Sequence, residues 1–186
     1  LGDVYKRQIK EDLGMLHKAE STMRRKREEL KNSRRKEMIG FRKIDPEVAM
    51  EKNTWFHLGR NSCEEILYCL RRIADPCEEH VDNNFVPLSK EQVKEYIPLR
   101  DTVLFLLRRT EKILQTDSYD EVDEVRREAE ELKDCLEKAR EAQMQRMQSS
   151  KENIAVAYLY LNLLQETREL TSSLRHLLRA SKGFRE

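Results

Sequence analysis

The stretch that decides the fold is residues 153–180, which read NIAVAYLYLNLLQETRELTSSLRHLLRA. Its large apolar residues repeat every seven positions: Val156, Leu163, Leu170 and Leu177. Three further residues fall on the same face, midway between them: Tyr160, Thr167 and Leu174. Side chains at this spacing share one face of an α-helix and pack against neighbouring helices. The stretch therefore predicts a long helix with one buried face.

The composition of the whole chain also favours helices. Of 186 residues only 5 are Gly and 4 are Pro, whereas 38% are apolar and 38% are charged. Helix interiors exclude Gly and Pro, while a sheet needs turn residues at short intervals. We therefore expect an all-α fold of about five long amphipathic helices, arranged as antiparallel bundles.

Local signals predict where the helices begin and end. A narrow apolar stripe predicts a helix over 9–38, and the Asp-Pro pair at 45–46 starts the next one. The same pair at 75–76 predicts that this second helix breaks or kinks near Ala74 and resumes to about Asp82, because Pro removes a backbone donor. Capping boxes, each a Ser followed three residues later by Gln or Glu, predict the last three starts: Ser89/Gln92, Ser118/Glu121 and Ser149/Glu152.

The predicted helices form two groups joined by a linker. Residues 9–82 correspond to a partial first bundle whose first helix is missing, 83–88 to the linker, and 89–182 to a second, up-down-up three-helix bundle. Residues 1–8 read as an artefact of sequence assembly. The stripe over 9–38 is too narrow to exclude water alone, so we expect this helix to lean on a partner.

Charge is distributed unevenly along a chain of net charge +1, with basic residues crowded at 24–43 and acidic residues at 117–134. A basic run can bind nucleic acid or an anionic membrane, but it is more often a solvated helix face or a partner for acidic segments. It lacks an interleaved series of aromatic residues for base stacking, so no nucleic acid is expected. The longest uncharged run, 153–165, is shorter than the ~20 residues that span a bilayer.

A candidate site emerges from acidic residues of the fourth predicted helix. Five carboxylates share a stripe that we expect to face outward, away from the core: Asp123, Glu130, Asp134, Glu137 and Glu141. Glu130 and Asp134 lie one turn apart and can share a cation if a neighbouring helix adds ligands, for which Glu169 is placed. The plainer interpretation is a solvated acidic face paired with Arg127 and Lys138.

Other reactive residues do not form a complete motif. The four Cys contain no C-x-x-C pair, which indicates reduced thiols. His80 lies three residues after Cys77, but this spacing matches no complete zinc pattern. There is no glycine-rich phosphate loop and no evident convergence of acid, base and nucleophile. We therefore do not expect an enzyme.

Five passages carry a resemblance to a known family: EVAMEKNTWFHL at 47–58, LYCLRRIADPC at 67–77, EHVDNNF at 79–85, LNLLQE at 161–166 and LRHLLRA at 174–180. Together they resemble the cytoplasmic C-terminal region of bacterial sodium/phosphate cotransporter family proteins, a region similar to the phosphate-uptake regulator PhoU. The resemblance extends over nearly all of the chain after residue 8. It implies two three-helix bundles in tandem, at the cytoplasmic face of the inner membrane.

The resemblance also implies a metal site. PhoU proteins hold divalent or iron cations at their surface with E-x-x-x-D pairs on two helices of each bundle. Glu130 and Asp134 match one such pair, while an amide or an arginine replaces the first acid of two others, which read Gln165/Glu169 and Arg71/Asp75. The ligands implied in this chain are therefore these four: Glu130, Asp134, Glu169 and Asp75.

The function implied by the resemblance is regulation of a sodium-dependent phosphate cotransporter, and hence a role in phosphate transport and homeostasis. The expected partner is the membrane domain of the same transporter, contacted through helix surfaces. One alternative is a free-standing PhoU-like regulator that binds metal. Another is a helical scaffold without a ligand, which would form a homodimer through the helix over 9–38.

Overall fold

The protein consists of long helices, and the described ranges contain no strand, which confirms the all-α class. The computed structural model describes residues 2–83, 86–149 and 152–186. The five helices are α1 (Gly2–Phe41), α2 (Pro46–Asp82), α3 (Lys90–Thr116), α4 (Val122–Ser149) and α5 (Ile154–Arg185). The first helix thus begins at Gly2, and it passes through the segment that we set aside on sequence grounds.

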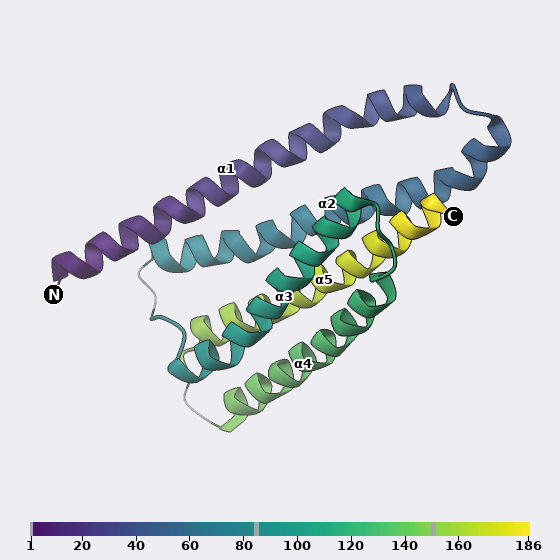
Figure 1. Cartoon of the computed structure of the whole chain (residues 1–186). Helices are drawn as coiled ribbons and strands as arrows, with labels where there is room; N and C mark the ends of the chain where they lie inside the picture. The colour runs from purple at the N-terminus through teal and green to yellow at the C-terminus, as the bar shows by residue number, and fades with distance from the viewer. Residues whose placement is uncertain (1, 84–85, 150–151) are drawn as a thin grey trace.

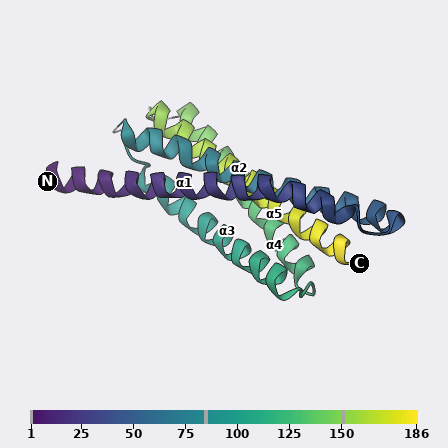
Figure 2. The ribbon, with the colours of Figure 1, turned by 90° about the horizontal axis from the view of Figure 1, so that it is seen from above.

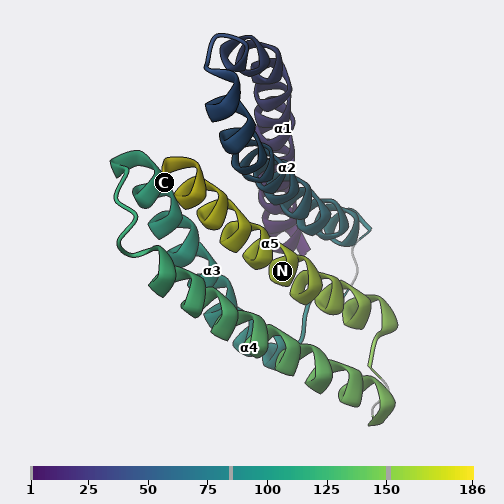
Figure 3. The same cartoon turned by 90° about the vertical axis from the view of Figure 1, so that its right-hand side faces the viewer.

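The helices form an α1–α2 hairpin and an α3–α4–α5 bundle (Figure 1). Seen from the side, α3, α4 and α5 run alongside one another with alternating directions, and the hairpin lies against α5 (Figure 3). Among the described residues, helix α5 packs against α2, α3 and α4, whereas α1 packs against α2 alone. The N-terminal end of α1 extends beyond the other helices (Figure 2). Helix α5, which belongs to the second predicted group, therefore joins the two groups by packing against α2 of the first.

The core lies inside the α3–α4–α5 bundle and follows the predicted heptads. On α5, Leu163 and Leu170 are 5% and 2% exposed, and Tyr160 is fully buried. The facing residues of α3 and α4 are also buried: Val103, Leu106, Ile113, Val125, Ala129, Leu132 and Leu136. The apolar stripe that decided the fold thus forms the centre of the bundle.

Helix α2 continues through Pro76, so the predicted break near Ala74 does not occur. Proline lacks the N–H that would reach the carbonyl four residues earlier, which belongs to Arg72. The side-chain amide of Asn162 on α5 donates to this carbonyl oxygen, at 2.9 Å. Because a neighbouring helix supplies the missing donor, the helix does not have to end at the proline.

Of the three predicted capping boxes, the described residues show the one at Ser89, while the side chain of Ser149 lies outside the described residues. The Ser89 hydroxyl accepts from the backbone of Gln92, at 3.1 Å, and the Gln92 side chain accepts from the backbone of Ser89, at 2.9 Å. Helix α4 begins at Val122, after a turn, and not directly after Ser118.

The cap of α5 is Asn153, whose side chain accepts from the backbone of Val156. The backbone of Ser149 is still part of α4. In this part of the chain, several Ser, Asn and Asp residues compete for the role of cap, and a rule based on local spacing does not decide among them.

The division into a partial bundle, a linker and a second bundle stays a prediction, but the contacts around it are defined. Residues 86–88 of the predicted linker are not helical, while Asn84 and Phe85 lie outside the described residues. Arg60 joins α1 to α2 by an ion pair with Glu37 and a hydrogen bond to the backbone carbonyl of Leu30. The hairpin is thus held together by a buried guanidinium as well as by its narrow apolar stripe.

Candidate functional site

The predicted acidic stripe of α4 does not face outward as a whole. Three of its carboxylates, spaced seven residues apart, form ion pairs with three basic residues of α5 that have the same spacing. The pairs are Asp123 with Lys182 at 3.0 Å, Glu130 with Arg175, and Glu137 with Arg168 at 3.7 Å. We call these three pairs the α4–α5 ladder. The stripe thus borders α5 on one side, whereas Asp123, Asp134 and Glu141 are exposed as expected.

The sequence contained a signal for the α4–α5 ladder. Acids at 123, 130 and 137 and bases at 168, 175 and 182 repeat with the same period, as charged residues do beside the apolar seam of a coiled coil. The plainer interpretation had named Arg127 as a partner of this stripe. In the structure Arg127 instead lies 3.9 Å from Glu131 on its own helix.

The four residues predicted to bind metal lie on three helices and have different neighbours. Glu130 is paired with Arg175 and lies 3.5 Å from Lys133, while Asp134 is exposed. Glu169 accepts from the side chain of Gln165 at 2.9 Å. On α2, Asp75 accepts from Arg71, at 3.0 Å. Since basic side chains or an amide already contact three of these carboxylates, metal binding by this set stays a prediction.

Another group of ligand-type side chains meets between α1 and α2. His17, Glu20 and Glu78 each place one ligand atom within 4.8 Å of the others, and within the part of the chain that the structure describes this is the one such group of three. The Nδ1 atom of His17 lies 3.1 Å from a carboxylate oxygen of Glu78. Sequence reasoning missed the group because Glu78 is far from the other two residues along the chain.

The Cys77/His80 pair that the sequence raised belongs to no group of three ligand-type side chains within the described residues. His80 is buried, and its Nε2 lies 2.8 Å from the backbone carbonyl oxygen of Val86. This contact ties the end of α2 to the segment that leads into α3. Burial raises the pKa of the Cys77 thiol. All four cysteines are free.

A partly buried polar network lies at the end of the bundle where α3 begins. Arg146 of α4 donates to both carboxylate oxygens of Glu95 on α3, at 2.7 and 2.9 Å, and the Tyr160 hydroxyl of α5 donates to the same carboxylate at 3.1 Å. Beside it, the side-chain amides of Gln92 and Gln143 are fully or almost fully buried and hydrogen-bonded to each other. The hydrogen bond from Arg146 lowers the pKa of Glu95, while burial raises the pKa of Tyr160.

The interface between α2 and α5 is polar at its centre. Arg72 of α2 forms an ion pair with Glu166 of α5, at 2.7 Å, next to the hydrogen bond from Asn162 to the Arg72 carbonyl. Burial raises the pKa of Glu166, against the opposing effect of Arg72. Burial likewise raises the pKa of the Cys69 thiol, to about 11. A thiol with such a pKa is protonated at neutral pH and is a poor nucleophile.

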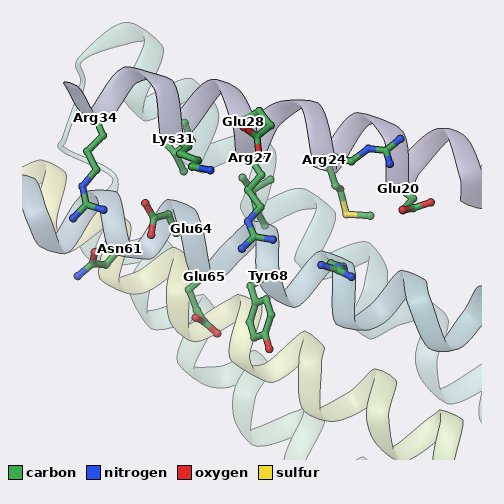
Figure 4. Close-up of a pocket in the computed structure, with 14 residues that line it drawn as sticks. Glu20, Arg24, Arg27, Glu28, Lys31, Arg34, Asn61, Glu64, Glu65 and Tyr68 are labelled. Carbon is green, nitrogen blue, oxygen red and sulfur yellow. The ribbon is translucent and has the colours of Figure 1, made fainter. Parts of the chain in front are cut away.

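A groove of about 890 Å³ runs along one side of the α1–α2 hairpin. Four cations of α1 line one wall of it: Arg24, Arg27, Lys31 and Arg34 (Figure 4). The apolar part of the lining consists of two residues from each helix: Met23, Leu30, Leu67 and Tyr68. We call this feature the hairpin groove. The basic run that the sequence showed at 24–43 therefore provides one wall of a groove.

Within the described residues, no helix combines the length and the apolar character that crossing a membrane requires. Comparison with family models, with curated proteins and with solved structures finds no match to the chain. A functional assignment therefore has to rest on the residues and the geometry given above.

Proposed function

We propose that this chain is a PhoU-like regulatory domain of a sodium-dependent phosphate cotransporter. In this proposal transport itself belongs to a membrane domain, which is the partner of the chain at the cytoplasmic face. The chain responds to the transporter, or acts on it, through contacts of its helix surfaces.

The observation that carries the proposal is where the family-like passages lie in the fold. Where the structure describes them, all five passages lie on α2, at its C-terminal end or on α5, and these two helices pack along each other. Residues of different passages are in contact. Arg179 lies over the ring of Trp55, with 5.9 Å between the guanidinium carbon and the ring centroid, and Arg72 is paired with Glu166. Family-like passages that meet in one interface support the resemblance more strongly than the same number of passages scattered over the fold.

The Pro76–Asn162 arrangement supports the same proposal. The passage at 67–77 contains the proline that leaves the Arg72 carbonyl without its helical donor, and the passage at 161–166 contains the Asn that donates to this carbonyl. Pro76 alone is unfavourable inside a helix, and Asn162 alone is unremarkable. Together they are explained, because Asn162 supplies the hydrogen-bond donor that Pro76 removes. This pairing favours a shared structural plan over chance similarity of helical sequences.

The decisive experiment is to obtain the coding sequence upstream of residue 9 and to measure phosphate uptake by the complete protein. We expect apolar segments long enough to span a membrane, and sodium-dependent uptake of radiolabelled phosphate into vesicles that contain the protein. Removing the present chain should leave sodium dependence in place but change the response of uptake to phosphate supply. An upstream region without such segments would contradict the proposal, as would uptake that is indifferent to removal of the chain.

A free-standing PhoU-like regulator that binds metal is the alternative, and one observation favours it. His17, Glu20 and Glu78 offer an imidazole and two carboxylates within 4.8 Å of one another. These are ligand types that divalent transition metals accept. Metal analysis of the purified protein tests it, with Glu78→Gln compared with the double variant Glu130→Gln/Asp134→Asn. Loss of metal in either variant would favour this alternative, and protein without metal would contradict it.

A further inference from the structure

The hairpin groove has one strongly basic wall. Arg24, Arg27, Lys31 and Arg34 are spaced three or four residues apart, which places them on one face of α1. They extend over ten residues, or about 15 Å along the helix. Within the part of the chain that the structure describes, none of these four side chains has a hydrogen bond or an ion pair. The wall is therefore a row of cations without internal partners.

The carboxylates of the opposite wall do not neutralise this row. On α2, Glu64 lies 3.2 Å from Arg60, and Glu65 lies 3.4 Å from Arg72. The lining also contains Glu20 and Glu28 of α1, but these are two carboxylates beside four cations. Arg71, on the α2 side, is itself paired with Asp75. The positive charge of the lining is therefore concentrated on the α1 wall, where it can meet an external anion.

The groove is also partly apolar, which indicates what kind of anion fits it. Met23 and Leu30 lie seven residues apart on α1 and are half-buried, and Tyr68 of α2 is 49% exposed. A small inorganic anion gains nothing from these surfaces. An amphipathic helix can use both the apolar surface and the cations of the groove. Its apolar face covers the apolar residues, while acidic residues along its edge pair with the cations.

We propose that the hairpin groove binds an acidic amphipathic helix of a partner protein. The apolar face of this helix packs on Met23, Leu30 and Tyr68, and its acidic edge pairs with the four cations of α1. The proposal accounts for two features of α1 together: its apolar stripe is narrow for a helix that, among the described residues, packs against α2 alone, and the four cations of the groove have no hydrogen bond or ion pair among the same residues. It goes beyond the proposed function and does not depend on it.

The test is binding of a synthetic, fluorescently labelled helical peptide to the complete 186-residue chain. The peptide has Leu at helical spacing on one face and four Glu along its edge, spaced as the four cations are. A second peptide of identical composition is shuffled so that neither period remains. We expect fluorescence anisotropy to show binding of the first peptide, at least about tenfold tighter than that of the second and weakened by salt.

A matched pair of variants locates the site. Arg27→Gln/Lys31→Gln removes two cations from the groove, whereas Arg25→Gln/Lys26→Gln removes two cations of the same helix that pair with Glu29 outside the groove lining. The net charge changes equally in both. We expect the groove variant to bind the peptide about tenfold more weakly, and the control to differ from the unmodified chain less than about twofold. Circular dichroism confirms that both variants keep their helices.

Several results would overturn the proposal. Equal affinity for the two peptides, or an equal decrease in affinity in the two variants, would mean that binding depends only on overall charge and not on the groove. Tripolyphosphate that binds more tightly than the patterned peptide would identify the occupant as a small polyanion. A sedimentation mass of twice the chain that reverts to one chain in the groove variant would show that a second copy fills the groove.

Discussion

At the scale of single residues, the contact between Asn162 and the Arg72 carbonyl explains why a proline is tolerated inside α2. The usual donor to this oxygen would be the backbone N–H of residue 76, which proline does not have. Asn162 replaces it from another helix, with an N–O distance of 2.9 Å. The sequence alone predicted a broken helix, because local rules for proline contain no information about a donor on α5.

We expect Asn162→Leu to lower the free energy of unfolding by about 1–3 kcal/mol, since it leaves the partly buried Arg72 carbonyl without a donor. In a Pro76→Ala background the same substitution should cost less, because the new alanine supplies a backbone N–H. Urea denaturation of the four proteins of this double-mutant cycle checks it. Equal costs in both backgrounds would mean that Asn162 acts through packing and not through the freed carbonyl.

Glu95 should give the bundle a pH dependence of known sign. Its pKa is lowered in the folded protein by Arg146, so its contribution to stability is complete above the unfolded value of about 4.5 and is lost as the pH falls below it. We expect Glu95→Gln to cost about 1–3 kcal/mol at pH 7, with a difference from the unmodified protein that shrinks on acidification.

Thermal denaturation between pH 7 and pH 3.5 measures this. The control is Glu91→Gln, since Glu91 is 69% exposed and lies 3.8 Å from the same arginine. It should change stability by no more than about 0.5 kcal/mol at any pH. If the two variants had the same pH profile, the buried geometry around Glu95 would not be the cause.

At the scale of helices, the α4–α5 ladder fixes how these two helices are aligned. Apolar heptads alone allow one helix to shift along another by a whole repeat with little loss of packing. Oppositely charged residues spaced seven apart on both helices oppose such a shift, because every pair must move together. The helices and their buried faces could be predicted from the sequence, but this alignment could not, because it depends on both helices at once.

Exchanging charges within the ladder tests this role. We expect Arg175→Glu, which places a second carboxylate beside Glu130, to cost about 0.5–1 kcal/mol, and Glu130→Arg in the same protein to recover much of the loss. The difference between the single and double variants should decrease in 1 M salt. Arg127→Gln serves as the control, because its partner Glu131 lies on its own helix, and Glu130→Arg should not compensate for the loss.

At the scale of the whole molecule, the contacts of α1 differ from those of every other helix. Helix α1 packs against α2 alone, whereas α5 packs against three helices. Local opening is easiest where few buried apolar contacts hold an element.

The candidate sites also differ in how much of them the sequence alone could predict. Carboxylates within one helix were found from their spacing, while the group of His17, Glu20 and Glu78 needed the fold to bring α1 and α2 together.

We expect backbone amides of α1 to exchange with deuterium at least about tenfold faster than those of α5, because α1 can separate from α2 without opening the bundle core. Hydrogen exchange followed by mass spectrometry measures this, and peptides from the buried part of α4 serve as the slow reference. Exchange of α1 and α5 at one common rate would show that the hairpin and the bundle unfold as a single unit.

The central position of α5 also matters for the order in which the chain can fold during translation. Every helix that packs against α5 precedes it in the sequence, so the apolar faces of α2, α3 and α4 leave the ribosome before their shared partner exists. At a synthesis rate of about 5–20 residues per second, the 32 residues of α5 take about 2–6 s to make. During that interval the apolar faces of α2, α3 and α4 are exposed to the cell. Chaperones or transient contacts within the nascent chain have to cover them until α5 has been synthesised.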